Sequence, residues 1–268
     1  MRQDVPEKLS LQQLRALIRN QEFTQNTSGL MPGLVQGNVA ILPASLATEF
    51  IEFCDLNPKP CPIIGFSQAG DARLPSLGEG IDIRTDVPEY YIIKQGQYSH
   101  SVTDITDYWQ DDMVAIVLGC SYSFEEALVS SGYDIRNVSL GLNVSMYDTN
   151  IPTKATQHFS GNTVVSMRPF KREDVAAVTE ITSHFSKTHG APIHVGDPAE
   201  IGISDIFQPN YGDSVIIEPD EVPVFWACGV TSQRILLGAK LPLVITHAPG
   251  KMLITDLQYE ELPKRYKS

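Results

Sequence analysis

The stretch Met113-Val-Ala-Ile-Val-Leu-Gly-Cys-Ser-Tyr-Ser-Phe-Glu-Glu126 decides the fold, because a short apolar run breaks at a glycine into small hydroxyl residues. The uninterrupted apolar run predicts a fully buried strand, and Gly119 permits a tight turn after it. Ser123, followed three places later by Glu126, is typical of a capping box at a helix N-terminus. The stretch therefore predicts a strand, a turn and a helix in direct succession.

The predicted turn has the chemistry of an anion site. Backbone N–H groups at a helix N-terminus carry partial positive charge, which favours phosphate or carboxylate. The hydroxyls of Ser121 and Ser123 add donors, and Cys120 adds a thiol whose pKa a helix N-terminus would lower. We therefore predict that Gly119, Cys120, Ser121 and Ser123 bind an anionic small molecule. The alternative is an ordinary connection between a strand and a helix.

A second segment repeats this pattern. The apolar residues 224–227 end in Cys228-Gly229, and the polar Thr231 and Gln233 follow. This segment is therefore predicted to be another apolar strand that ends in a turn of small and polar residues.

Composition and charge exclude several classes of function. With 42% hydrophobic and 19% charged residues, the chain has the composition of a globular protein. No apolar run approaches the roughly 18 residues that cross a bilayer, so we expect no membrane span. A net charge of −12 without a Lys/Arg cluster would repel a phosphate backbone, so we expect no nucleic-acid partner. The polar N-terminus lacks the apolar core of a signal peptide, which predicts a cytoplasmic protein.

Periodicity divides the chain into helices and strands. Helices are predicted over residues 11–20, 44–54 and 172–186, the first with a capping box at Ser10. Strands are predicted over residues 39–42, 90–94, 140–147, 163–167, 193–195, 224–227, 243–246 and 252–255. Residues 24–38 are rich in glycine and polar side chains and form a candidate active-site loop. This order predicts the α/β class, with a layered αβα domain (1–136 plus 236–268) and a smaller inserted α+β domain (137–235).

Polar residues outside the turn add candidates for substrate binding. Arg84 stands close to Asp86, and a guanidinium beside a carboxylate could grip a substrate carboxylate, with a surface ion pair as the alternative. Arg168 ends a predicted strand and could fix an anion or form an interdomain ion pair. We predict that Arg84 and Arg168 bind substrate.

Histidines and carboxylates supply candidates for proton transfer. Between His189 and Asp197, two imidazoles and a carboxylate fall within nine residues, and these residue types bind Mn or Zn or supply a base. The spacing matches no standard ligand motif, and His194 on a strand need not converge with its neighbours. His247 at a strand end is either a base or a structural histidine. The predicted catalytic residues are His194, His247, Asp86 and Asp197.

The cysteines support a competing hypothesis. Cys54, Cys61, Cys120 and Cys228 contain no CxxC pair, which argues against structural zinc and a disulfide framework. Cys120 at a helix N-terminus could act as a nucleophile in amide or acyl transfer, although buried free cysteines mostly serve packing. Dinucleotide, P-loop, zincin and serine-esterase motifs are absent from the sequence.

At these motifs the chain resembles the D-glutamate cyclase family of hydro-lyases. The resembling segments are Pro32-Gly-Leu-Val-Gln36, Asn57-Pro-Lys-Pro-Cys-Pro62, Asp82-Ile-Arg-Thr-Asp86, Gly119-Cys-Ser-Tyr-Ser-Phe-Glu125, Met146-Tyr147 with Thr149-Asn-Ile151, Val165-Ser-Met-Arg-Pro169, His189-Gly-Ala-Pro192, Gly196-Asp-Pro198, Phe225-Trp-Ala-Cys-Gly-Val-Thr231 and Thr246-His247. They follow in order along nearly the whole chain. One departure is Ser145, where the family is expected to carry proline.

The resemblance implies a lyase that eliminates water, and in eukaryotic relatives the reaction closes D-glutamate to 5-oxo-D-proline. It also implies a layered domain with a smaller α+β domain, and Mn as the metal. The expected partner is a small-molecule carboxylate substrate. A non-catalytic sensor for an acidic amino acid is a further alternative. The sequence leaves open the true substrate, the need for a metal and the oligomeric state, a homo-oligomer included.

Overall fold

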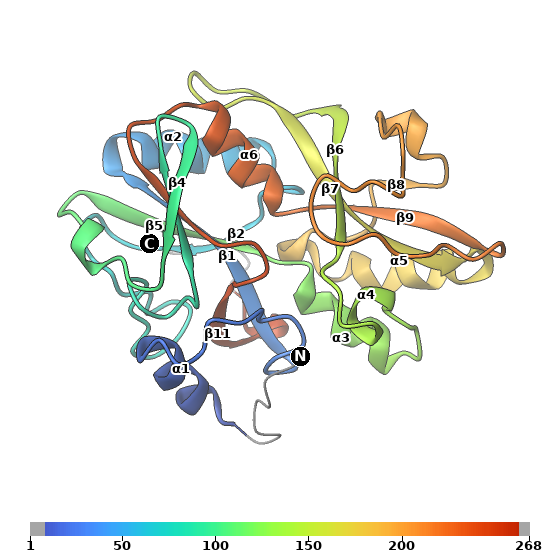
Figure 1. Ribbon diagram of the computed structural model, residues 1–268, viewed down its shortest axis with the longest axis horizontal. Coiled ribbons are helices and arrows are strands. Elements are labelled where there is room, and N and C mark those ends of the chain that lie inside the picture. Colours follow the sequence, from blue (N-terminus) through green and yellow to red (C-terminus); the bar gives the residue numbers. More distant parts are fainter. Residues whose placement is uncertain (1–8, 263–268) are drawn as a thin grey trace.

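The computed structural model describes residues 9–262 and contains two antiparallel β-sheets (Figure 1). The first sheet contains β1 (Leu34–Pro43), β2 (Ile63–Phe66), β3 (Tyr90–Lys94), β4 (Gln97–Val102), β5 (Met113–Gly119), β10 (Val244–His247) and β11 (Leu253–Gln258). Its order is β2-β5-β1-β10-β3-β4, and β11 also pairs with β1. The central strand β1 therefore borders three other strands.

The second sheet is smaller and has the order β6-β7-β9-β8. It contains β6 (Ser145–Pro152), β7 (Asn162–Lys171), β8 (His194–Val195) and β9 (Glu221–Ala227). The α-helices are α1 (Leu11–Arg19), α2 (Ala44–Leu56), α3 (Tyr122–Ser130), α4 (Arg136–Ser139), α5 (Val175–Ser183) and α6 (Val230–Gly238). This confirms the predicted α/β class with two sheets. The division into domains at residues 137 and 235 stays a prediction.

Both faces of the first sheet are covered. Val114, Ile116 and Leu118 of β5 belong to the apolar cluster that α2 and α6 complete. The alternate residues of β5 belong to a second cluster, which Leu74 and Ile83 of an irregular segment help to form. Every residue of β5 is buried, as its uninterrupted apolar run predicts, even though its neighbours are antiparallel. None of the helices in the described part of the chain is long and apolar enough to cross a membrane.

Helices α3 and α6 each pack against the sheet that does not contain the strand preceding them in the chain. Helix α3 follows β5 of the first sheet, but its Phe124 and Leu128 pack with Trp226 of the second sheet. Helix α6 follows β9 of the second sheet, but its Ile235 and Leu236 pack in the cluster of the first sheet. In Figure 1, α3 accordingly lies near α4 and α5, whereas α6 lies on the side of α2. Because the chain passes from one sheet to the other after β5 and again after β9, the ends of these two strands lie at the junction between the sheets.

Most predicted elements are present with shifted ends. The capping box at Ser10 is confirmed, with its side chain accepting from the N–H of Gln13 at 3.2 Å. The predicted loop over 24–38 ends earlier because β1 begins at Leu34. The predicted strand over 140–147 starts only at Ser145, because a short helix and a turn precede it. The predicted helix over 172–186 is α5 flanked by short 3-10 turns.

Candidate functional site

The first turn of interest, Cys120-Ser121, joins β5 to α3. The N–H of Cys120 donates to the Gln36 carbonyl at 3.0 Å, and the N–H of Gln36 donates to Ser123 Oγ at 3.2 Å. These bonds tie the start of α3 to β1. The helix begins directly after Ser121, which makes no side-chain capping bond. The predicted capping box of Ser123 and Glu126 is therefore wrong, because Ser123 lies inside the helix and its hydroxyl binds another strand.

The second turn, Cys228-Gly229, joins β9 to α6 and makes the same contacts. The N–H of Cys228 donates to the Val164 carbonyl at 2.9 Å, and the N–H of Val164 donates to Thr231 Oγ1 at 2.9 Å. Cys228 and Thr231 thus hold the places that Cys120 and Ser123 hold in the first turn. The chain therefore contains an internal repeat of two paired strands, a turn that begins with cysteine, and a helix.

The two turns meet at Asn38 of β1. Asn38 Nδ2 donates to the Gly119 carbonyl at 3.1 Å. A Cβ atom on Gly229 would lie 2.2 Å from Asn38 Nδ2, so a larger residue there would have to displace the Asn38 side chain. The thiol of Cys228 is close enough to Cys120 to raise its pKa. We name the following residues the junction cluster: Asn38, Gly119, Cys120, Ser121, Glu125, Ser166, Arg168, His189, Cys228 and Gly229.

Arg168 carries the positive charge of the junction cluster and is 1% exposed. Its Nε donates to Glu125 Oε1 at 2.9 Å, and its two terminal nitrogens donate to the hydroxyls of Ser121 and Ser166, each at 3.2 Å. Its guanidinium carbon lies 5.2 Å from the ring centroid of Phe124. A buried charge of this kind needs a paired charge and satisfied hydrogen bonds. Glu125 supplies the pairing, a role that the sequence analysis missed although Glu125 stands in the opening stretch.

The two thiols of the junction cluster are neutral near pH 7. Burial raises the pKa of Cys120 to about 12 and that of Cys228 to about 11. The N–H groups of Tyr122 and Val230 and the charge of Arg168 oppose this only in part. The expectation that a helix N-terminus would lower the pKa of Cys120 is therefore wrong, because desolvation outweighs the N–H groups.

His189 is a buried imidazole with one ring nitrogen that has no hydrogen-bond partner among the described residues. Its ring is 1% exposed, and Nδ1 lies 2.9 Å from the Lys59 carbonyl, so Nδ1 is assigned the proton. Nε2 is then unprotonated, and it has no hydrogen-bond partner among the described residues. Burial is the main reason why the pKa of His189 is lowered to about 4; the charge of Arg168 adds to this effect, and the carbonyls of Lys59 and Gly119 oppose it. A neutral imidazole placed in this way can accept a proton from a ligand.

His247 lies on the other side of β1 and has the opposite tautomer. The N–H of Val39 donates to His247 Nδ1 at 3.1 Å, so Nε2 carries the proton. Gln233 Nε2 donates to the His247 carbonyl at 3.1 Å, and Thr246 Oγ1 beside it has no partner among the described residues. Burial lowers the pKa of His247 to about 4. Its predicted catalytic role stays a prediction.

Arg84 and Asp86 belong to a separate ion-pair cluster. Arg84 binds Asp82 through two nitrogens, at 2.8 and 2.6 Å. Asp86 binds Arg19 of α1 at 2.5 and 2.7 Å, and Arg15 lies 3.9 Å away. These contacts fasten α1 to the segment before β3, and the partners lie outside the junction cluster. The predicted roles of Arg84 and Asp86 in substrate binding and catalysis stay predictions.

His194 and Asp197 also lie outside the junction cluster. His194 Nε2 contacts the backbone carbonyl of Asp197 at 2.7 Å, and its ring packs on Phe225 with centroids 5.6 Å apart. The Asp197 carboxylate accepts the N–H of Ala199 at 2.9 Å and caps a short 3-10 helix. The carboxylate therefore does not orient the imidazole. Within residues 9–262, no three or more His, Cys, Asp or Glu side chains are placed to hold a metal ion. The donor set of this part of the chain does not fit the expected Mn.

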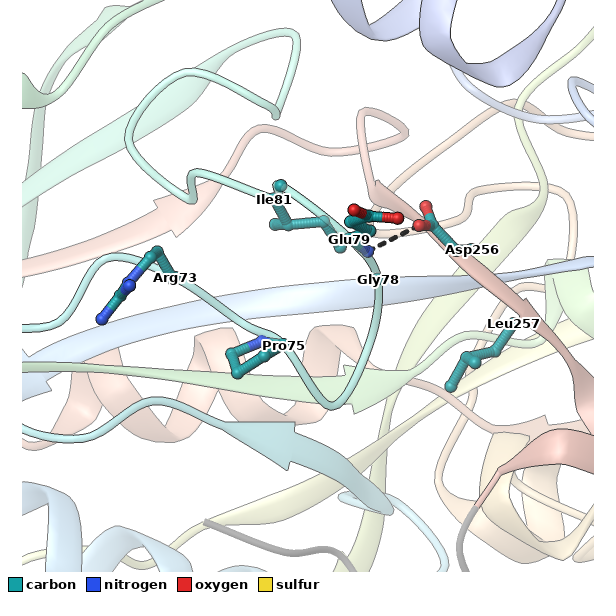
Figure 2. A pocket seen from close by; sticks show the side chains of 8 residues that line it. Arg73, Pro75, Gly78, Glu79, Ile81, Asp256 and Leu257 are labelled. Carbon is teal, nitrogen blue, oxygen red and sulfur yellow. Dashed lines mark hydrogen bonds between the residues drawn. The ribbon is translucent and has the colours of Figure 1, made fainter.

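A surface cavity of about 570 Å³ lies beside β11 (Figure 2). Its lining includes Arg73, Glu79, Ile81 and Asp256. Asp256 accepts the N–H of Glu79 at 2.7 Å and pairs with Arg15 at 2.7 Å, so its charge is already engaged. The Arg73 guanidinium is bound by a neighbouring aspartate at 2.8 Å. Both of these charged groups in the cavity lining are therefore already paired with other side chains.

The free energy of unfolding is expected to fall in acid, because His189 and His247 are buried in their neutral form. The pKa values of His189 and His247 are lowered to about 4, below the ordinary value of 6.5. Between these values the unfolded chain binds more protons than the folded chain, so stability falls as the pH falls from 7 to 4. The loss is about 3 kcal/mol for each ring at pH 4. Urea unfolding at pH 7, 5.5 and 4 measures this loss. In the His189→Asn variant, the free energy of unfolding should depend less steeply on pH. An unchanged profile in that variant would contradict the assignment.

The family model and the related sequences point to one family. A family model described as D-glutamate cyclase matches residues 114–256. A protein of Aliivibrio salmonicida named "Putative hydro-lyase" is 56% identical over 92% of this chain and 95% of its own length. A protein of Bradyrhizobium diazoefficiens with the same description is 51% identical over 95% of this chain and 94% of its own. Among solved structures, a nitrogen repressor-like protein from Methanococcus jannaschii is similar at 10% identity and a TM-score of 0.36, covering 92% of this chain and 98% of its own. That similarity is too weak to assign a function.

Proposed function

Because the chain belongs to the D-glutamate cyclase family, we propose that it removes water from a small acidic amino acid in the junction cluster. In its most specific form, the proposal is that D-glutamate closes to 5-oxo-D-proline. The observation that carries it is Arg168, a buried guanidinium that lies among the starts of α3 and α6 and binds Ser121. Helix N-termini and a buried cation together favour a carboxylate ligand.

The reaction requires the substrate amine to attack its own side-chain carboxylate. The ammonium nitrogen loses two protons, and these leave with one carboxylate oxygen as water. His189 Nε2, which has no hydrogen-bond partner among the described residues, is the candidate acceptor for a proton of the ammonium group. The N–H groups at the starts of α3 and α6 are suited to stabilise the oxyanion that forms when nitrogen adds to the carboxyl carbon. The Nε2–H of His247 stays a candidate donor for the departing hydroxyl.

The test measures water loss from D-glutamate. We expect wild-type protein to yield a product lighter by one water molecule, and L-glutamate and 2-hydroxyglutarate serve as comparison substrates. His189→Asn is expected to lower kcat about 100-fold or more, because a proton acceptor is lost. Asparagine tolerates the left-handed backbone of residue 189, where φ is 84°.

His184→Asn is the matched control, because His184 is largely exposed and pairs with Glu180 at 3.4 Å. This variant should keep the wild-type rate. If no product appears from any of these compounds, the cyclase proposal fails for them. If His189→Asn turns over normally, His189 is not the base.

A further inference from the structure

Glu125 and Gln233 hold equivalent places in the internal repeat. Glu125 lies five residues after Cys120, and Gln233 lies five residues after Cys228. Both side chains are buried, and each belongs to a helix that covers the sheet of the other half. One half of the repeat therefore carries a carboxylate at this place, and the other half carries a neutral amide of nearly the same shape.

The carboxylate of Glu125 pairs with a permanent charge, whereas the amide of Gln233 meets a histidine. Glu125 Oε1 accepts from Arg168 Nε at 2.9 Å. Gln233 Nε2 donates to the His247 carbonyl at 3.1 Å and lies 3.4 Å from each of the two ring nitrogens. The amide group therefore contacts the imidazole and the backbone of the same residue. In both halves, the residue at this place contacts a buried basic side chain.

Helix α6 reaches β10 because its start lies close to β1. Gly229 precedes the helix, and a Cβ atom there would meet the Asn38 side chain of β1. Gln233 follows Gly229 by four residues, so the two lie on the same face of the helix. Strand β10 pairs with β1 and ends at His247. The contact between Gln233 and His247 therefore follows from the way α6 is seated on the first sheet.

No charged group of the described residues acts on the His247 ring: burial lowers its pKa, and only the backbone of Val39 opposes this. From β1, the N–H of Val39 donates to Nδ1 at 3.1 Å. From β3, Tyr90 lies opposite in the strand register, and its hydroxyl donates to the Ile83 carbonyl. From α6, Gln233 is neutral. The ring is thus held by two neutral groups, with Nδ1 as the acceptor and the proton on Nε2.

We propose that Gln233 is the positioning residue for His247, and that its amide fixes the ring as a neutral hydrogen-bond donor to the reacting carboxyl group of the substrate. This inference rests on the proposed function, which supplies that carboxyl group. A glutamate at residue 233, as in the other half, would favour the charged imidazolium. An imidazolium donates from both nitrogens, so it could no longer accept the N–H of Val39. The amide therefore sets both the charge and the orientation of the ring.

The test follows the His247 ring by NMR in intact protein labelled with nitrogen-15. Its ring signals are identified by their absence from the spectrum of His247→Asn. In wild type, the ring should stay neutral at pH 7 with the proton on Nε2, and it should titrate near pH 4. In Gln233→Glu, the titration midpoint should rise by about one to three pH units, because an opposite charge beside the ring favours its protonated form.

Gln97→Glu is the matched control, since it adds the same charge at an exposed position of the edge strand β4. It should leave the titration of His247 and the rate of water loss unchanged. Gln233→Leu removes the amide without adding a charge. Its His247 ring should stay neutral at pH 7, while kcat for water loss should fall about 10-fold or more, because the donor is no longer held in place. Gln233→Glu should lose kcat to a similar extent.

Two results would overturn the proposal. One is a Gln233→Glu ring that titrates as in wild type, and the other is a Gln233→Leu protein that keeps the wild-type kcat. The leucine variant decides the matter if the glutamate variant does not fold. If wild type removes water from none of the substrates, the proposed function fails for them, and the titration still decides whether Gln233 sets the charge of the ring. Water loss together with an unshifted titration would leave the proposed function standing and remove Gln233 from it.

Discussion

We expect Arg168→Met to lower the free energy of unfolding by about 3 to 5 kcal/mol, because it leaves the buried Glu125 carboxylate without its partner. Methionine matches the length of the arginine stem but removes the guanidinium, whose carbon lies over the rings of Phe124 and Trp226. The loss therefore contains the lost contacts with these rings as well as the unpaired charge of Glu125. Urea unfolding at pH 7 measures it.

A double variant separates stability from binding. In Arg168→Met with Glu125→Gln the buried site carries no charge, so we expect most of the lost stability to return. Turnover should remain at least 100-fold below wild type in both variants, because the cation that we propose to bind the substrate is gone. Recovery of turnover in the double variant would show that Arg168 serves only the fold.

We expect Gly119→Ala to destabilise the protein by about 3 kcal/mol, the upper part of the range for overpacking. A Cβ atom at residue 119 would lie 1.9 Å from the carbonyl oxygen of Lys187. The obstacle is backbone, so either β5 or the segment that carries His189 must move. Turnover should fall together with stability, and urea unfolding with a water-loss assay on the same preparation measures both.

Gly238→Ala is the matched control for this substitution. Gly238 is the last residue of α6, and a Cβ atom there would meet nothing within 4 Å. Alanine also favours a helix over glycine by up to about 1 kcal/mol. This variant should be as stable as wild type or slightly more stable. A Gly119→Ala protein that matched it would contradict the close approach of Lys187.

Local patterns predicted the elements of this fold well. The buried β5, the capped α1 and the repeated strand that ends in Cys228 could all be derived from periodicity and turn residues. The antiparallel pairing could not, because a strand covered on both faces has the same apolar run in either direction. The exchange of α3 and α6 depends on contacts between distant segments, which periodicity does not encode.

The site could be predicted only in part. The structure brings the predicted Gly119, Cys120, Ser121 and Arg168 together, and their roles in binding remain to be tested. His189 was visible beside His194, but the choice between them depends on burial and on the Lys59 carbonyl, a contact across more than a hundred residues. Arg84 and Asp86 looked like a substrate clamp because the sequence did not show that Asp82 and Arg19 would occupy them.

The exchanged helices have a consequence for how the chain reaches its final state. A cut between α3 and β6 would leave α3 on the first fragment and the sheet that it covers on the second. The second fragment would in turn hold α6, which completes the core of the first. Neither fragment contains a finished core, and each carries the piece that the other lacks. The two halves must therefore fold together. The junction cluster between them forms only when α3 has packed on the second sheet and α6 on the first.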